Sequence, residues 1–137
     1  IKIKKKTLKY KGLKIRYFKS YIRKKNNALQ IFLDYLSHLI ALFMKTIFCL
    51  NIKSDVTLTF ATSPIFQALP AIFYSRIKKI PNIIWVQDLW PEVLEDTGYI
   101  KNKFILKIID ILVMYIYSQS DLIITQSESF KKYIKNK

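Results

Sequence analysis

The stretch that decides the fold is Ile83–Gly98, which reads IIWVQDLWPEVLEDTG. It opens with four β-favouring apolar residues and continues with the polar residues Gln87 and Asp88. A Trp-Pro pair then ends the strand, because proline lacks a backbone N–H and has a fixed φ. Acidic residues follow, where a helix N-terminus favours negative charge. The stretch therefore predicts a buried strand that delivers polar side chains to its carboxyl end, the edge where open α/β sheets bind ligands.

Strands and helices are predicted to alternate around this stretch. Apolar runs predict strands over 55–62, 83–87 and 121–126, and helical spacing predicts helices over 65–79 and 101–118. Such alternation with short turns is typical of a doubly wound, Rossmann-like parallel sheet, whose strands are covered on both faces. We expect one α/β domain over residues 1–137, incomplete at its N-terminus. In the helix over 101–118 the spacing places Lys103, Lys107 and Asp110 on the solvent side and predicts an inward face made of Phe104, Ile105, Ile108, Ile111, Leu112, Tyr115 and Ile116.

Each predicted strand ends in small polar residues. These are Thr62-Ser63, Gln87-Asp88 and Gln126-Ser127. Because parallel strands end at the same edge, the three pairs are expected to form a polar rim over an apolar sheet, which indicates a ligand cleft. Their side chains can bind a substrate or cap the helices that follow, and the two roles are compatible. Ser127 is expected to cap a final helix that begins near Glu128.

Asp88 is the leading candidate for a catalytic role, with Glu92 a weaker one. A carboxylate at a strand end can take a proton from a hydroxyl group or orient it. The alternative is structural: Asp88 would cap the helix that begins at Pro91, and Glu92 would complement the helix dipole. Trp90 is likewise either a stacking platform for a sugar or a core residue.

The N-terminal third is basic and contains the longest apolar helix. Alternation predicts a strand over 13–18, and Asn26 or Asn27 is expected to cap a helix over 28–50. That helix is amphipathic, and its charged residues favour a packed helix over a membrane span. Its apolar face consists of Leu29, Phe32, Leu33, Leu36, Ile40, Phe43 and Ile47, and its polar face of Gln30, Asp34, Ser37, His38, Ala41 and Lys45.

Composition excludes several classes of function. The chain has two glycines, so a Gly-rich phosphate loop cannot be formed. His38 and Cys49 are the only residues of their types, so neither a disulfide, a histidine triad nor a thiolate metal cluster is expected. The net charge is +15, and 21 of the 24 basic residues are lysine. Nucleic-acid readers favour arginine, so we expect no nucleic-acid partner and leave anionic membranes or a general compositional bias as explanations.

Three segments together resemble a known family. They are 55–81, which contains TSP at 62–64, 83–104, which contains DLWPE at 88–92, and 120–134, which contains the QS pair at 126–127. In combination they resemble the N-terminal half of family-four glycosyltransferases with the GT-B fold. The subgroup is that of the WbuB-type and colanic-acid-type sugar transferases of bacterial surface polysaccharide assembly. The similarity covers residues 45–137 well and residues 10–45 loosely.

The resemblance implies a retaining glycosyltransferase that uses a nucleotide sugar as co-substrate and needs no metal or other cofactor. The N-terminal domain of such enzymes holds the acceptor, often a polyprenyl-linked glycan, at the inner face of the cytoplasmic membrane. Asp88 would then be catalytic or acceptor-side, and Thr62, Ser63, Gln87, Trp90, Gln126 and Ser127 would bind substrate. A cytoplasmic, peripherally membrane-bound protein is expected.

The resemblance also implies that the chain is a fragment. The family's opening strand, its Gly-rich loop and its C-terminal donor domain have no counterpart in these 137 residues. We therefore expect the chain alone to be inactive. The alternative interpretation is a non-catalytic module in which the basic segments and the helix over 28–50 bind a membrane surface.

Overall fold

The computed structural model describes residues 7–23 and 28–137 and divides the chain into two units, residues 1–45 and 46–137. The predicted caps Asn26 and Asn27 lie outside the described residues. Each unit is described by itself below.

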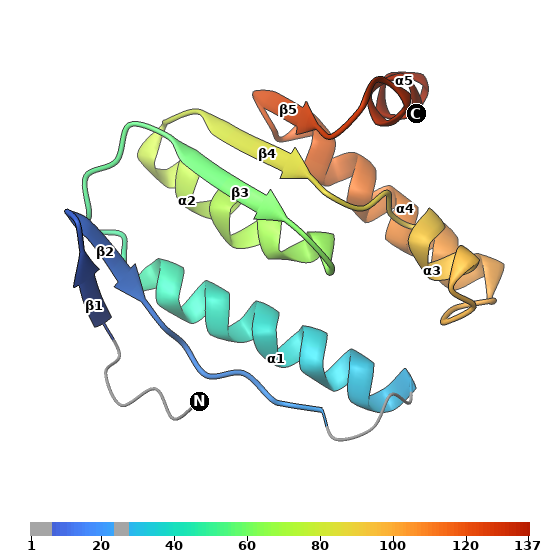
Figure 1. Ribbon diagram of the computed structural model, residues 1–137, viewed down its shortest axis with the longest axis horizontal. Coiled ribbons are helices and arrows are strands. Elements are labelled where there is room, and N and C mark those ends of the chain that lie inside the picture. Colours follow the sequence, from blue (N-terminus) through green and yellow to red (C-terminus); the bar gives the residue numbers. More distant parts are fainter. Residues whose placement is uncertain (1–6, 24–27) are drawn as a thin grey trace. The chain divides into compact units, whose positions relative to one another are not determined.

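The first unit begins with a β-hairpin that sequence analysis did not predict. Strands β1 (Thr7–Tyr10) and β2 (Leu13–Arg16) pair antiparallel (Figure 1). The turn between them uses Lys11 and Gly12, both at positive φ, and glycine adopts this conformation at no steric cost. The predicted strand over 13–18 is therefore shorter than expected and ends at Arg16.

Helix α1 (Ala28–Ile47) follows, and most of it belongs to the first unit. Its predicted polar face contacts the extended segment 17–23, through side chains such as Asp34, Ser37 and His38. Six of the seven residues of its predicted apolar face are exposed: Leu29, Phe32, Leu33, Leu36, Ile40 and Ile47. The helix is thus amphipathic as predicted, with its polar side against the chain's own residues 17–23.

The second unit contains a three-stranded parallel sheet in the order β3-β4-β5. The strands β3 (Thr57–Ala61), β4 (Asn82–Val86) and β5 (Leu122–Thr125) match the three predicted strands within two residues at each end. The connections contain the short 3-10 helix η1 (Ile65–Gln67), α2 (Ala68–Lys78), α3 (Glu92–Asp96) and α4 (Lys103–Ser118), and α5 (Glu128–Asn136) follows β5. This part of the chain is an α/β structure, compatible with a Rossmann-like arrangement.

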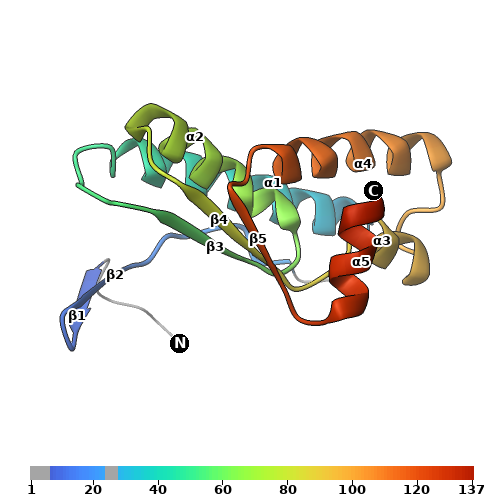
Figure 2. The same cartoon turned by 90° about the horizontal axis from the view of Figure 1, so that it is seen from above.

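Helices α2 and α4 cover one face of the sheet, and the core lies between these layers (Figures 1 and 2). Ile84 and Val86 of the central strand have no exposed surface, nor have Val113 and Ile116 of α4. Burying each such aliphatic side chain contributes about 1.5–3 kcal/mol. This layer holds the strand ends in place.

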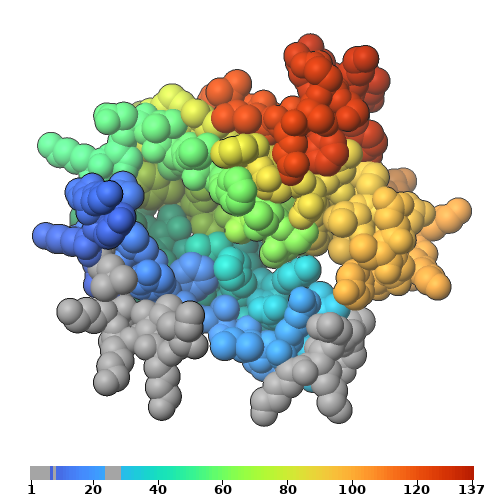
Figure 3. All heavy atoms as spheres, viewed as in Figure 1, coloured from blue at the N-terminus to red at the C-terminus, as the bar shows by residue number. Residues whose placement is uncertain are grey.

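The other face of the sheet carries exposed apolar side chains. Leu58 and Phe60 of β3, Trp85 of β4, and Leu122 and Ile124 of β5 are all exposed, and they alternate along the strands with residues that are buried or half-buried. In the space-filling view this face lies at the surface, green for β3 and yellow for β4 (Figure 3). Sequence analysis expected helices over both faces, and within residues 46–137 they cover one.

The predicted inward face of α4 is largely wrong. Ile116 is buried as expected, and Leu106 and Val113 join it in the core. The exposed residues include five that were predicted to point inward: Phe104, Ile105, Ile108, Ile111 and Tyr115. Because α4 is apolar around most of its circumference, its spacing alone does not identify the side that packs on the sheet.

Candidate functional site

The carboxyl ends of β3, β4 and β5 bring the predicted rim residues together. In the parallel register Ala61 pairs with Val86, and Val86 pairs with Thr125. The polar residues that follow each strand therefore begin at one level along the same edge of the sheet. This placement is the one that sequence analysis predicted for a ligand cleft.

Ser63 and Asp88 form the contact between the ends of β3 and β4. The Ser63 hydroxyl donates a hydrogen bond of 2.7 Å to Oδ2 of Asp88. Beside it, Nε2 of Gln67 donates to the carbonyl oxygen of Thr62 at 3.0 Å and to its Oγ1 at 3.2 Å. A hydrogen bond to a carboxylate is roughly twice as strong as one between neutral groups, so Ser63 orients the Asp88 side chain.

The alternative role of Asp88 as a helix cap is wrong. Helix α3 begins at Glu92 with Pro91 at its N-cap position, and no side chain of the described residues, Asp88 included, caps it. The carboxylate of Asp88 instead faces Ser63 across the rim, and both residues are at least partly accessible to solvent. Asp88 is thus available for contact with a ligand.

Gln87 and Gln126 join the ends of β4 and β5. Nε2 of Gln126 donates to the carbonyl oxygen of Gln87 at 2.7 Å and to its Oε1 at 2.9 Å. The first of these bonds fixes the orientation of the Gln126 amide, and the second fixes that of Gln87. Nε2 of Gln87 is then buried and has no hydrogen-bond partner among residues 7–23 and 28–137. A buried donor without a partner costs about 1–3 kcal/mol, so a rotation of this side chain that let it donate to a ligand would be favourable.

Ser127 and Trp90, the remaining residues predicted to bind substrate, have structural positions. Ser127 accepts a hydrogen bond from the backbone N–H of Phe130 and caps α5, as predicted. Trp90 is 2% exposed and makes an edge contact with Phe66, with the ring centroids 5.2 Å apart. Its ring belongs to the core, which is the second of the two roles that the sequence left open.

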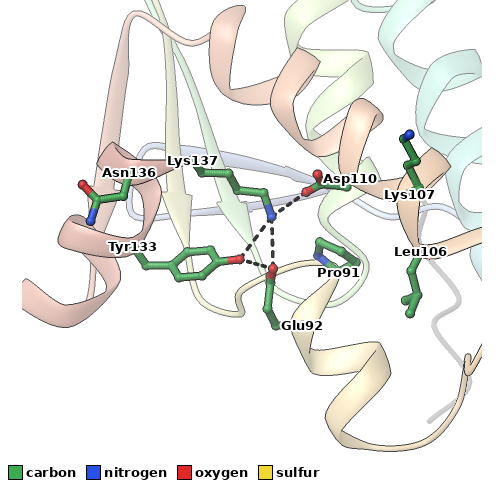
Figure 4. Close-up of a pocket in the computed structure, with 8 residues that line it drawn as sticks. All are labelled: Pro91, Glu92, Leu106, Lys107, Asp110, Tyr133, Asn136 and Lys137. Atoms are coloured by element: carbon green, nitrogen blue, oxygen red, sulfur yellow. Dashed lines mark hydrogen bonds and ion pairs between the residues drawn. The ribbon is translucent and has the colours of Figure 1, made fainter. Parts of the chain in front are cut away.

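Glu92 lies away from the strand ends, in a pocket of about 520 Å³ between α3, α4 and α5 (Figure 4). Nζ of Lys137 lies 2.6 Å from a carboxylate oxygen of Asp110 and 3.1 Å from Oε1 of Glu92. It also donates to the Tyr133 hydroxyl and to the carbonyl oxygen of Trp90. The Tyr133 hydroxyl in turn donates to Glu92. We call these four residues, Glu92, Asp110, Tyr133 and Lys137, the ion cluster.

The ion cluster changes the acidity of its members. Burial lowers the pKa of Lys137, but hydrogen bonds to Asp110, Glu92 and Tyr133 outweigh it, so the pKa lies above its usual value. Burial, and then the hydrogen bond to Glu92, raise the pKa of Tyr133. Burial raises the pKa of nearby Tyr117 to about 12. Lys137 is therefore positively charged at neutral pH and offsets part of the negative charge of the two carboxylates beside it.

Sequence analysis missed this cluster. The helical spacing placed Asp110 on the solvent side of α4, whereas its carboxylate contacts Lys137 at the C-cap of α5. The signal in the sequence was weak: Tyr133 and Lys137 are four residues apart on one helical face, and an acidic residue interrupts an apolar helix. Glu92 holds α5 through these contacts, and this is a structural function.

Among residues 7–23 and 28–137 there is no group of three metal-ligating side chains, and no helix has the length and apolarity needed to cross a bilayer. Comparisons with protein-family models, with curated proteins and with solved structures found no match. The resemblance to glycosyltransferases therefore rests on the sequence motifs.

Proposed function

We propose that the chain is the acceptor-side domain of a retaining, GT-B-type glycosyltransferase of surface polysaccharide assembly. The observation that carries the proposal is the contact between Ser63 of the TSP motif and Asp88 of the DLWPE motif. Two motifs 25 residues apart meet at the carboxyl edge of a parallel sheet, the edge where such sheets bind ligands.

In this proposal Asp88 accepts a hydrogen bond from the acceptor hydroxyl and increases the nucleophilicity of its oxygen. Gln87 contributes its unpartnered N–H to another acceptor oxygen, and Ser63 keeps the carboxylate in position. The nucleotide sugar would be held by a second domain that these 137 residues do not include. Transfer requires both substrates in one closed cleft, so the chain alone would bind without turnover.

The location that follows is the cytoplasmic face of the cytoplasmic membrane, with peripheral contact, because a polyprenyl-linked acceptor is anchored there. The rival function is a non-catalytic membrane-surface module, which the exposed apolar face of α1 supports. The two functions make different predictions for variants of Asp88. Vesicle flotation of the Asp88→Asn variant should equal that of the unaltered chain under both functions, whereas acceptor binding should depend on Asp88 only under the first.

The test is a titration of the 15N-labelled chain with farnesyl-diphosphate-linked N-acetylglucosamine. We expect the side-chain amide signals of Gln87 and Gln126 to shift, and UDP-glucose to leave them unchanged. The Asp88→Asn variant should bind about tenfold more weakly, since a hydrogen bond to a charged group contributes about 1.5–3 kcal/mol.

The matched control is Asp55→Asn, because Asp55 is exposed and precedes β3, at the opposite edge of the sheet. This variant should bind like the unaltered chain. If Asp88→Asn and Asp55→Asn bind the acceptor with equal affinity, the rim is not the acceptor site. If the amide signals shift with UDP-glucose alone, the acceptor-side assignment is contradicted.

A further inference from the structure

The ion cluster lies in a pocket that the proposed function does not use. The pocket has a volume of about 520 Å³ and lies between α3, α4 and α5 of the second unit (Figure 4). Sites for small molecules have volumes of about 300–1,000 Å³. The residues that line it are distinct from those of the rim. We call it the cluster pocket.

The two oxygens of the Glu92 carboxylate have different surroundings. Oε1 lies 3.1 Å from Nζ of Lys137 and accepts a hydrogen bond from the Tyr133 hydroxyl. Oε2 is buried and has no hydrogen-bond partner among residues 7–23 and 28–137. Lys137 has three N–H groups, and its Nζ already contacts four oxygen atoms of the chain. A carboxylate oxygen away from water is stabilised by a donor, so Oε2 indicates a ligand that donates a hydrogen bond.

Tyr117 provides a second polar group without a partner. It is 8% exposed, and its hydroxyl is buried with no hydrogen-bond partner in the described part of the chain. Tyr117 follows Asp110 by seven residues on the same side of α4. Its hydroxyl lies near the ion cluster, since the charges of all four cluster members affect its pKa. An acceptor and a hydroxyl beside one pocket thus both lack partners.

The charge of the pocket lining indicates a neutral ligand. The lining contains two lysines, Lys107 and Lys137. It also contains two acids, Glu92 and Asp110, so the formal charges cancel. A cationic ligand would be disfavoured by the net charge of +15, and an anionic ligand by the two carboxylates. A neutral ligand avoids both repulsions.

The remaining lining favours a ring that carries hydroxyl groups. A hydroxyl can donate to Oε2 of Glu92 and can also accept hydrogen bonds through its lone pairs. The exposed side chains of Lys107 and Asn136 carry donors that can turn toward such oxygens. Pro91 and Leu106 add an apolar wall, which suits the C–H groups on the face of a ring.

We propose that the cluster pocket binds a neutral cyclic polyol, the chemistry of an inositol or of a sugar ring, and that one ring hydroxyl donates to Oε2 of Glu92. The inference does not depend on the glycosyltransferase proposal, because it involves no residue of the rim. The contacts of Oε1 still hold α5, so binding adds to the structural function of Glu92 and does not replace it.

The test is a titration of the 15N-labelled chain with myo-inositol and, separately, with methyl α-glucopyranoside. We expect a saturable shift of the side-chain amide signal of Asn136, with a Kd of roughly 1–10 mM for a ligand of about a dozen non-hydrogen atoms. Binding of the glucoside would identify a sugar ring within a glycan as the occupant, and binding of myo-inositol alone would identify a free polyol. Both results support the proposal.

Two results of the titration would overturn the proposal. One is the absence of a saturable Asn136 shift up to about 100 mM of either polyol. The other is a set of shifts confined to Gln87 and Gln126, which would place the polyol at the rim. Ethylammonium chloride and acetamide serve as controls for the ligand class. If either shifts Asn136 at lower concentration than the polyols, a cyclic polyol is the wrong class.

The contact with Glu92 is tested by the Glu92→Gln variant. Binding should weaken about tenfold, since a hydrogen bond to a charged acceptor is lost. The matched control is Glu95→Gln, which makes the same change at an exposed position of α3 outside the pocket lining. Equal affinity of the two variants would overturn the proposal.

A second pair of variants leaves the ion cluster intact, in case Glu92→Gln releases α5. Lys107→Met removes an exposed donor of the pocket lining and should weaken binding about threefold. Lys103→Met makes the same change one turn earlier in α4, outside the lining, and should leave the affinity unchanged. If the two lysine variants bind the polyol equally, the ligand does not lie in the cluster pocket.

Discussion

Replacement of Lys137, the C-cap residue of α5, by methionine should destabilise the second unit more than is usual for a residue at a helix end. Its ammonium group contacts two carboxylates, at 2.6 Å for Asp110 and 3.1 Å for Glu92, and accounts for a hydrogen bond of 3.2 Å to the carbonyl oxygen of Trp90. The Lys137 side chain is only 11% exposed. Methionine keeps most of its length and apolar surface but removes the charge.

The magnitude follows from these contacts. A hydrogen bond to a charged group contributes about 1.5–3 kcal/mol when it is shielded from water. The side chains of Glu92 and Asp110 are 33% and 40% exposed, so water recovers part of this energy, and we count about 1 kcal/mol for each pair. Adding the repulsion of two unneutralised carboxylates gives a loss of roughly 2–3 kcal/mol. For a unit of this size that corresponds to a fall in Tm of roughly 10–20 °C.

The assay is urea unfolding followed by tryptophan fluorescence. Both tryptophans, Trp85 and Trp90, lie in the second unit, so the signal reports on that unit alone. The control is Lys131→Met within α5, whose ion pair with Glu128 also measures 3.1 Å but has side chains 52% and 75% exposed. It should cost less than about 0.5 kcal/mol.

The two variants share residue type and an ion-pair distance of 3.1 Å, and they differ in burial and in the number of partners. If Lys137→Met costs no more than Lys131→Met, the ion cluster does not anchor α5 and the reasoning from exposure fails. A triple variant, Lys137→Met with Glu92→Gln and Asp110→Asn, should recover part of the loss because it removes the two unpaired charges.

Three further predictions concern the core, the pH dependence and turnover. Ile84→Ala should cost about 2–4 kcal/mol in urea unfolding, because Ile84 is fully buried in the central strand, whereas Leu58→Ala on the exposed face should cost less than about 1 kcal/mol. The folded state holds the phenol proton of Tyr117 more tightly than the unfolded state, with its pKa raised from 10.0 to about 12. Stability should therefore fall between pH 10 and 12, by up to about 3 kcal/mol, and Tyr117→Phe should reduce that slope. The purified chain should transfer no sugar from nucleotide-sugar donors, and transfer above background would contradict its assignment as an acceptor-side domain.

The sheet could be predicted from the sequence because its signals are local. β4 combines an apolar run with a following proline, and β3 and β5 are short apolar runs that also end in polar residues. The role of Ser127 as the N-cap of α5 could also be predicted, because capping depends on a residue and its next three neighbours. The order β3-β4-β5 follows from short connections and parallel crossovers.

The side of a helix that faces the core could not be predicted in the same way. Hydrophobic periodicity says which residues share a face but not what lies against that face. In α1 the polar face is the one that contacts segment 17–23, and in α4 apolar residues occur on both the buried and the exposed side. Lys137 was missed for a similar reason, because its partners come from α3 and α4, which are remote in sequence.

The contacts of the rim follow from the register of the sheet. Ala61 pairs with Val86, so the residues two positions further on, Ser63 and Asp88, are also level, and they are hydrogen-bonded. Val86 pairs with Thr125, so Gln87 and Gln126 are level one position further on, and they too are hydrogen-bonded.

The sequence predicted these four residues one strand at a time, and the register joins them into pairs. A shift by one residue would turn each side chain to the other face and separate both pairs. The buried residues Ile84 and Val86 hold β4 in register against both neighbours, because such a shift would expose them. The geometry of the rim is therefore determined by core residues that never contact a ligand.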